Sequence, residues 1–353
     1  MKGIKKAVLG IDVYSVNQDF SKVKLNQNES SIKIPVKIKE EIFRRIKDLD
    51  WNRYPSKTAD SLIEKIADYT DFAPSGIIAG NGSNELIQTL IFATCNSGDK
   101  ILVVKPCFSI YKRIASIMNI DVIEIPLKDD FSFDVEAIIE KGREVKLIIL
   151  DSPNNPTGKA LKIKEIDKIA INFDGIVAVD EAYYEFHKQT AQESINKLQN
   201  IVVIRTFSKA LMMAGARIGY LLGTREIVGE LLKAKLPFSL GIFQQVAGRV
   251  ILENKRIIGE SVRKIIKERE RLLGELKKIM DIQPFPSCAN FILFETKGKK
   301  GKDLYKILYE NGVVIRYFEI SRLKNMLRVT VGTHEENDIF LEKLRRIIER
   351  RLW

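Results

Sequence analysis

The feature that most constrains the fold is an alternation of strand-like and helical patterns through the middle of the chain. Short runs rich in Val and Ile recur there as KILVVKP, DVIEIPL, VKLIILDSP, GIVAVDEAY, NIVVIRTF and RIGYLLG, and several are followed by turn residues and a helical stretch. Continuous apolar strands that alternate with helices are typical of a sheet covered on both faces. The sequence therefore predicts an α/β domain with a mostly parallel sheet.

The pattern changes near residue 255. Apolar residues at helical spacing predict one long amphipathic helix over Arg256–Met280, which is suited to joining two domains. The runs ANFILFE, GVVIRYF and MLRVTVG follow, and a last helix begins near Thr333, where Thr333 and Glu336 can form a capping box. The tail is therefore expected to be a smaller α+β unit. We assign residues 48–255 to a large domain and residues 1–47 and 256–353 to a small one.

The net charge of +12, from 58 basic and 46 acidic side chains, raises the alternative of a nucleic-acid partner. However, the basic residues are spread along the chain and mostly interleaved with Glu, as in KERERLLGELKK, and the basic clusters KGKKGK and RRIIERR are short. This pattern favours a solvated surface, so we expect no nucleic-acid partner. A diffuse positive field favours small anionic substrates.

Few residues suit a disulfide framework or a metal site. The cysteines Cys95, Cys107 and Cys288 are odd in number and lack a C-x-x-C spacing, and His187 and His334 are too sparse for a His-based metal site. We therefore expect no metal. No apolar run approaches the length of a membrane span, and the apolar run at the start is too short for a secretory signal. These features predict a cytoplasmic protein with no membrane partner.

Two stretches carry groups suited to a phosphate. AGNGSNELIQTL places glycines and a serine directly before an apolar helical pattern, and the free N–H groups of a helix N-terminus bind phosphate well. It lacks G-K-[ST], so it is not a nucleotide P-loop, and a capped helix after a tight turn is the plainer alternative. RTFSKALMMAGARIGY adds Thr206, Ser208 and Arg217 as donors.

Lys209 stands among these donors, in a segment with little other charge. A lysine amine attacks a carbonyl only when it is unprotonated, and nearby positive charge with partial desolvation lowers its pKa. The segment therefore suits Schiff-base formation. The alternatives are an ordinary surface ammonium or a Ser-Lys dyad, although the S-x-x-K spacing of penicillin-binding enzymes is absent.

Three further polar residues follow strand-like runs, where ligands of α/β sheets collect. Asn155 lies in DSPNNPTGK, whose two prolines fix a rigid turn, and it could hydrogen-bond a ligand oxygen; a structural turn is the alternative. Asp180, in AVDEAYYEF, ends an apolar strand, where a carboxylate is costly unless it is paired. It could satisfy a protonated ring nitrogen, and Tyr183 could reach the same ring.

Arg328 lies inside the apolar strand pattern MLRVTVGT. An arginine with apolar neighbours on both sides should meet an anion, because an unpaired buried guanidinium is costly. The anion could be a substrate, or a carboxylate of the protein in an internal salt bridge.

Together these groups describe a site for pyridoxal phosphate. At this point the chain resembles the class I and II aminotransferases of fold type I, over nearly its whole length. SPNNPTG, DEAYYEF and TFSKA…AGARIGY are together highly specific. The motifs KLNQNES, RYPS, GNGSNELI, IRTFSKA and LRVTVGTHEEN resemble the branch of that family that acts on histidinol phosphate. The resemblance implies a large domain with a mostly parallel, seven-stranded type of sheet, plus a smaller α+β domain.

The resemblance also implies roles for the residues at matching positions. Lys209 would form the Schiff base and shuttle the proton, and Asp180 would keep the pyridine nitrogen protonated. Asn155 and Tyr183 would bind the phenolic oxygen of the ring, and Phe108, in KPCFSIY, would stack on it where many relatives have Tyr. The phosphate would be bound by Gly82, Ser83, Asn84, Thr206, Ser208 and Arg217.

The substrate side and the partner subunit are implied in the same way. Arg328 would bind the substrate anion, helped by Arg316 and Tyr14, with Asn26 nearby. Tyr54, in RYPS, would reach the phosphate of the neighbouring subunit in a homodimer. Two departures bear on substrate choice. NESS stands where the family usually has NEN-P, and GSNE stands where it commonly has GSDE.

The expected reaction is a ping-pong amino transfer in histidine biosynthesis, from L-histidinol phosphate to 2-oxoglutarate, which gives imidazole-acetol phosphate and L-glutamate. The alternatives are another aminotransferase for aromatic or other amino acids, and a threonine-phosphate decarboxylase that uses the same cofactor. A regulator that binds the cofactor and carries a DNA-binding domain is a further alternative, but the resemblance leaves no room for such a domain.

Overall fold

The computed structural model describes residues 3–13 and 17–350. Its larger unit is built on a seven-stranded sheet with the strand order β2-β8-β7-β6-β5-β3-β4. The strands are β2 (Ile77–Gly80), β3 (Lys100–Lys105), β4 (Asp121–Pro126), β5 (Leu147–Asp151), β6 (Ile176–Asp180), β7 (Ile201–Thr206) and β8 (Gly219–Leu222). Six of the predicted runs form β3 to β8, which confirms the predicted sheet; β8 alone is antiparallel to its neighbours.

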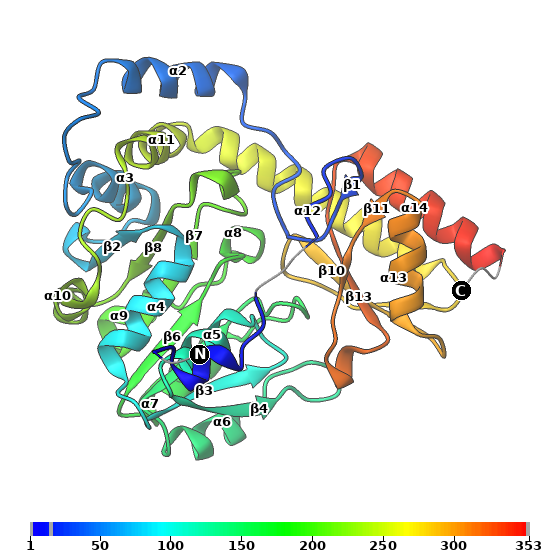
Figure 1. The fold of residues 1–353 in the computed structure, drawn as a ribbon, viewed down its shortest axis with the longest axis horizontal. Coiled ribbons are helices and arrows are strands. Elements are labelled where there is room, and N and C mark those ends of the chain that lie inside the picture. Colours follow the sequence, from blue (N-terminus) through cyan, green and yellow to red (C-terminus); the bar gives the residue numbers. More distant parts are fainter. Residues whose placement is uncertain (1–2, 14–16, 351–353) are drawn as a thin grey trace.

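Helices cover both faces of this sheet, as Figure 1 shows. The alternation of side chains along each strand explains why. In β5, for example, Ile148 and Leu150 belong to the buried cluster on one face, and Leu147 and Ile149 belong to the cluster on the other. The helices of the unit are α3 (Asp60–Thr70), α4 (Gly82–Thr94), α5 (Ile110–Ile117), α6 (Val135–Gly142), α7 (Ile163–Ile171), α8 (Tyr184–His187), α9 (Gln192–Leu198), α10 (Arg225–Ala234) and α11 (Ile242–Glu253).

The helix α12 (Lys255–Lys277) leads from α11 to the small unit, which confirms the predicted connecting helix (Figure 1). The four-stranded sheet of this unit has the order β12-β13-β10-β9. The elements are β9 (Ile282–Pro284), β10 (Phe291–Thr296), α13 (Gly301–Glu310), β11 (Val313–Val314), β12 (Arg316–Tyr317), β13 (Met326–Thr330) and α14 (His334–Glu349). Thr333 and Glu336 form the predicted capping box at the start of α14.

The N-terminal region contributes to both units. Strand β1 (Val23–Lys24) pairs in parallel with β11 of the small unit. Helix α2 (Val36–Lys47) packs on α11, and its Ile38 and Ile46 join a buried cluster of the large unit. Residues 36–47, which we assigned to the small domain, thus pack on the large unit. The predicted domain bounds stay a prediction. A short helix, α1 (Lys6–Leu9), lies against α5. None of the described helices is long and apolar enough to cross a membrane.

Candidate active site

A cavity of about 860 Å³ opens where the carboxyl ends of β5, β6 and β7 face the small unit. Its wall contains most of the predicted site residues, which come from the sheet, from the small unit and from the segment around residue 27. The predicted residues in the wall are Asn26, Ser83, Asn84, Phe108, Asn155, Asp180, Tyr183, Thr206, Ser208, Lys209, Arg217, Arg316 and Arg328.

Two predicted residues lie elsewhere, and one lies outside the described residues. Gly82 is just behind the wall, because a Cβ at this position would lie 2.7 Å from Arg217 Nη2. Tyr54 is 83% exposed and packs on Phe238, away from this cavity. Tyr14 falls in the undescribed range 14–16.

The amine of Lys209 is placed and tuned for attack on a carbonyl. Its Nζ donates a hydrogen bond to the backbone oxygen of Gln27 at 2.9 Å. Burial, together with the positive charges of Arg328 and Arg217, lowers the pKa of Lys209 to about 7, against the opposing charge of Glu29. A neutral amine is therefore well populated near pH 7, which is the condition for nucleophilic attack.

Asp180 lies at the end of β6 as a buried carboxylate that is 4% exposed. Its Oδ2 accepts from the Tyr111 hydroxyl at 2.7 Å, and its Oδ1 accepts from the N–H of Ala182 at 3.1 Å. Burial raises the pKa of Asp180 to about 6, against the opposing effect of the Tyr111 hydrogen bond. Such a carboxylate would be stabilised by a cationic group in the cavity, and the protonated nitrogen of a pyridine ring meets that requirement.

Donors suited to a phosphate converge beside Lys209. Helix α4 begins at Gly82 and directs the free N–H groups of its first turn to this corner. Arg217 Nη1 donates to Ser208 Oγ at 3.3 Å, and Thr206 Oγ1 donates to the same oxygen at 2.9 Å. A side chain at Gly219 would put its Cβ 2.4 Å from the nitrogen of Ser83, so glycine allows β8 to pass the start of this helix. Hydroxyls, a guanidinium and the start of a helix thus supply donors of the kind that suit an anion.

The side chains predicted to bind a ring oxygen, Tyr183 and Asn155, also line the cavity. The Tyr183 hydroxyl accepts a hydrogen bond from Asn28 Nδ2 at 2.9 Å, and burial raises its pKa to about 12. The phenol is therefore protonated at neutral pH and can donate. Asn155 Oδ1 accepts a hydrogen bond from Arg328 Nη1. The Tyr183 phenol and the Asn155 amide are both part of the cavity wall.

Arg328 is buried in β13 and stands between the two units. In addition to Asn155, its guanidinium donates through Nη2 to the backbone oxygen of Asn26 at 2.7 Å. The rings of Phe291 and Phe318 lie 5.1 and 5.6 Å from its central carbon. Arg316 is its register partner across β12 and β13, so the two side chains share one face of the small sheet. This face offers two cations to an anionic substrate.

Four residues of the wall that hydrogen-bond to predicted site residues were not assigned roles from the sequence. Tyr111, which holds Asp180, lies three residues after Phe108, but nothing local marked it. Gln27 and Asn28 lie within KLNQNES, and their contacts with Lys209 and Tyr183 span 182 and 155 residues. Asp151 ends β5 as Asp180 ends β6, so the rule that identified Asp180 could have identified it.

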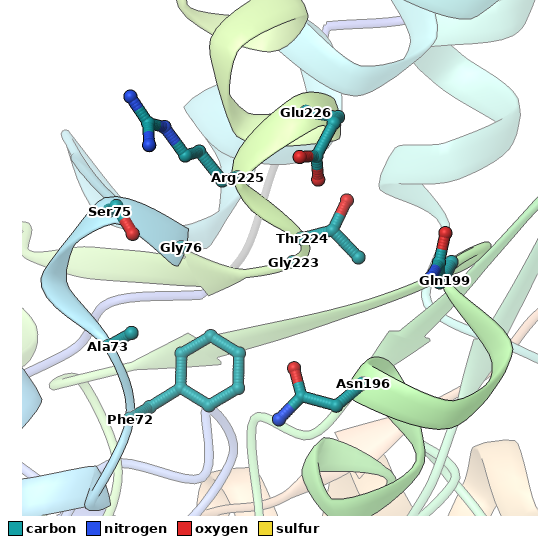
Figure 2. A pocket seen from close by; sticks show the side chains of 10 residues that line it. All are labelled: Phe72, Ala73, Ser75, Gly76, Asn196, Gln199, Gly223, Thr224, Arg225 and Glu226. Atoms are coloured by element: carbon teal, nitrogen blue, oxygen red, sulfur yellow. The ribbon is translucent and has the colours of Figure 1, made fainter.

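A second hollow, of about 250 Å³, lies at the start of α10 (Figure 2). Figure 2 shows Thr224, Arg225 and Glu226 at the helix start, with the ring of Phe72 on the facing segment. Thr224 caps α10 by accepting from the N–H of Ile227 at 3.3 Å. None of the predicted site residues lines this hollow.

The comparison with known proteins agrees with this geometry. The model of the family "Aminotransferase class I and II" matches residues 21–344. The chain belongs to the class I and II aminotransferases. Two curated relatives in the family are called histidinol-phosphate aminotransferase. The one from Clostridium kluyveri is 38% identical, over 95% of this chain and 96% of its own length. The one from Prosthecochloris aestuarii is 35% identical, over 98% and 97%.

A solved aminotransferase shows the same fold. The histidinol-phosphate aminotransferase of Sinorhizobium meliloti, determined in complex with pyridoxal-5'-phosphate, superposes with a TM-score of 0.90. It covers 100% of this chain and 99% of its own, at 21% identity, a level that supports the fold alone. The predicted fold of a class I and II aminotransferase is thereby confirmed, and so is the predicted enzyme class.

Proposed function

We propose that this aminotransferase moves the amino group of L-histidinol phosphate to 2-oxoglutarate, giving imidazole-acetol phosphate and L-glutamate. The reaction is ping-pong, with pyridoxal phosphate as cofactor, and serves histidine biosynthesis. The observation that carries the proposal is that the amine of Lys209 and the buried carboxylate of Asp180 line one cavity, which Arg316 and Arg328 line as well. The relatives that share 35–38% identity over nearly the whole chain support the choice of substrate.

The residues present fit the cofactor. Lys209 would hold its aldehyde carbon, and Asp180 would pair with its ring nitrogen. Tyr183 and Asn155 would bind its ring oxygen, and Phe108 would cover the ring. The phosphate would occupy the corner formed by the start of α4 and the side chains of Thr206, Ser208 and Arg217. Pyridoxal phosphate supplies an aldehyde that binds amines covalently and a protonated ring that withdraws electrons from the carbon bearing the amine.

Lys209 does the proton transfer in this scheme. Its Nζ, when not bound to the cofactor, would accept the proton released from the substrate carbon and hold it for return. A pKa of about 7 suits both tasks, because the amine accepts and returns a proton near neutral pH. Asp180 keeps the ring nitrogen protonated through its negative charge.

The two arginines explain how one site serves two substrates. One substrate presents a phosphate and the other presents carboxylates, and a guanidinium binds either anion through paired N–H donors. Arg328 is held by Asn155 and by the backbone of Asn26, while Arg316 stands beside it on β12. Tyr14 is proposed to assist them.

The test is a half-reaction with purified enzyme that carries the cofactor. Adding L-histidinol phosphate should convert the aldehyde absorbance to that of the amine form, and 2-oxoglutarate should restore it. L-Phenylalanine and threonine phosphate serve as comparisons for the two alternative activities. The proposal fails if histidinol phosphate leaves the spectrum unchanged, or if carbon dioxide is released from threonine phosphate at a higher rate.

The working form is proposed to be a cytoplasmic homodimer. Exposed aromatic side chains lie near Tyr54 in the chain and in contact with it: Trp51 is 63% exposed and packs edge-on against Phe243, and Tyr54 packs on Phe238. Phe238 is followed in the chain by Ser239, which hydrogen-bonds Glu85 of α4 at 3.0 Å. A second copy related by a two-fold axis would cover these aromatic side chains and bring its Tyr54 to the phosphate corner.

Sedimentation of the purified protein checks this arrangement. Two copies are expected at micromolar concentration, and Tyr54→Phe should weaken the cofactor by about tenfold without dissociating the dimer, since one hydrogen bond to a charged phosphate is lost. A monomer with full activity would contradict it.

A further inference from the structure

Asp151 is a buried carboxylate that the roles assigned above do not use. It is the last residue of β5, is 3% exposed and belongs to the cavity wall. Its Oδ2 accepts from the backbone N–H of Asn155 at 3.1 Å and from that of Phe108 at 3.3 Å. Its Oδ1 accepts from Asn154 Nδ2 at 2.9 Å. All three donors are neutral, and all belong to loops of the active site.

These hydrogen bonds join two loops that are distant in the sequence. The loop after β3 carries Phe108, which is expected to cover the cofactor ring, and the loop after β5 carries Asn155. One oxygen of Asp151 binds the backbone of both residues. Asn154, which binds the other oxygen, also donates to the backbone oxygen of Pro106 at 3.0 Å and thus closes the same junction. The carboxylate therefore fixes the distance between the two loops.

The connection continues to the small unit. The side-chain oxygen of Asn155 accepts a hydrogen bond from Arg328, whose other terminal nitrogen donates to the backbone of Asn26. A path of hydrogen bonds thus runs from the end of β5 through Asn155 to the arginine on β13. A shift of the Asn155 backbone would move the group that orients this guanidinium.

We propose that Asp151 is a positioning residue: by tying the Asn155 loop to the Phe108 loop, it sets the orientation in which Arg328 meets the substrate anion. The inference rests on the proposed role of Arg328 in binding that anion. Asp151 touches neither substrate nor cofactor in this scheme and acts through Asn155.

A carboxylate is required at this position because three N–H donors point at its two oxygens. An amide side chain has one oxygen and one NH₂ group, so one edge would present a donor to another donor. Asp151 also stands next to Asp180, its register partner on β6, with both carboxylates on the same side of the sheet. Burial raises the pKa of Asp151 to about 7, and the neighbouring charge of Asp180 contributes.

The experiment compares Asp151→Asn with Ser152→Ala. Ser152 is a matched control because it is also buried at the start of this loop, and its Oγ accepts from Leu161 N at 2.9 Å, outside the Asp151 network. The readout is the dissociation constant of succinate, a dicarboxylate that cannot react, measured from the absorbance change of the holoenzyme. Asp151→Asn should weaken succinate by about ten- to a hundredfold, the effect expected for losing hydrogen bonds to a charged group. Ser152→Ala should change it less than about twofold.

A second comparison isolates the path through Asn155. In an Asn155→Ala background, Asp151→Asn should weaken succinate by less than about twofold further, because the link to Arg328 is already cut. An equal loss in both backgrounds would overturn the inference, as would a succinate affinity in Asp151→Asn within about twofold of the unaltered enzyme. A loss of the same size in Ser152→Ala would attribute the effect to general loosening of the loop and would also overturn it.

Amide hydrogen exchange keeps the inference testable if Asp151→Asn does not fold. In the unaltered protein the amides of Phe108 and Asn155 should exchange at least about a hundredfold slower than unprotected amides. Exchange of either amide at the rate of an unprotected amide would refute the proposal that Asp151 holds the two loops together. If the unaltered enzyme does not bind succinate, the assignment of 2-oxoglutarate as substrate fails, and the exchange rates alone decide on Asp151.

Discussion

Two buried carboxylates follow one another on the chain and are compensated in opposite ways. Glu181 forms a salt bridge with Arg205 at 2.9 Å, in which each side chain is 2% exposed, and it also accepts from Thr190 Oγ1 at 2.8 Å. Asp180, one residue earlier, accepts only from a tyrosine hydroxyl and a backbone amide and belongs to the cavity wall. Glu181 contacts a guanidinium, whereas Asp180 has no ion-pair contact among the described residues and feels the charge of Lys209 only from a distance.

The difference follows from the geometry of a strand and its end. Successive side chains point to opposite faces, so Asp180 faces the cavity while Glu181 turns toward the Arg205 side chain on the neighbouring strand. A buried charge is costly unless it is paired. We call the Arg205–Glu181 ion pair a completed pair, which belongs to the fold, and we call a buried charged group without an ion-pair contact an uncompleted group, which indicates a binding site. The half-buried Lys209, whose Nζ donates to a backbone oxygen, belongs to the second group.

The largest expected effect concerns the uncompleted group. Lys209→Ala removes both the covalent attachment and the proton carrier, so turnover should fall by at least about 10⁴-fold. The cofactor should still bind through the phosphate corner, but the absorbance of the Schiff base should be missing. Steady-state transfer and the spectrum of the purified variant measure the two effects. Turnover near that of the unaltered enzyme would refute the role of Lys209.

A change in the Arg205–Glu181 pair should lower the stability of the protein and leave its activity nearly unchanged. Glu181→Gln leaves the buried guanidinium of Arg205 without its countercharge, which costs about 3–5 kcal/mol of unfolding free energy. Activity per folded molecule should stay within about threefold, because Glu181 faces away from the cavity. Urea unfolding and active-site titration of the same preparation separate the two quantities. A large loss of turnover with unchanged stability would show that Glu181 serves the reaction and not the fold.

Much of the fold was predictable because its signals are local. The strands β5, β6 and β7 are buried on both faces, so their apolar runs and the polar residues directly after them mark both the sheet and the positions of Asn155, Asp180 and Lys209. The capping box at Thr333 is also a local pattern. The reversed direction of β8 has no such signal, since strand direction depends on how the chain returns to the sheet.

The site could be predicted only in part, because half of its wall is assembled by contacts distant in the sequence. Gln27 and Asn28 reach Lys209 and Tyr183 from the N-terminal segment, and Tyr111 reaches Asp180 across 69 residues. No spacing rule identifies such partners within one chain. The role of Tyr54 depends on a second copy and therefore stays a prediction.

Asp180→Asn sharpens the contrast with the completed pair. Loss of the negative charge that would pair with the ring nitrogen should lower turnover by about 10²–10³-fold, the usual cost of removing one electrostatic stabiliser of a transition state. The cofactor-free variant should be at least as stable as the unaltered protein, since a buried carboxylate without a countercharge has been removed. Activity assays and thermal unfolding of the cofactor-free proteins test both expectations. A clear fall in stability would show that Asp180, like Glu181, belongs to the fold.

The smallest expected effect is the pH dependence of the cofactor-free protein. Lys209 has a folded-state pKa of about 7, below the usual lysine value of 10.5, so the unfolded chain binds more protons between these two values. Stability should therefore rise as pH increases from about 7 to 10.5, by on the order of 1–3 kcal/mol from this residue. Lys209→Met should flatten the curve in that window, as measured by urea unfolding at each pH. Because the completed Arg205–Glu181 pair needs no proton change in this range, a rise that persists unchanged in Lys209→Met would show that the uncompensated charges of the cavity do not control stability.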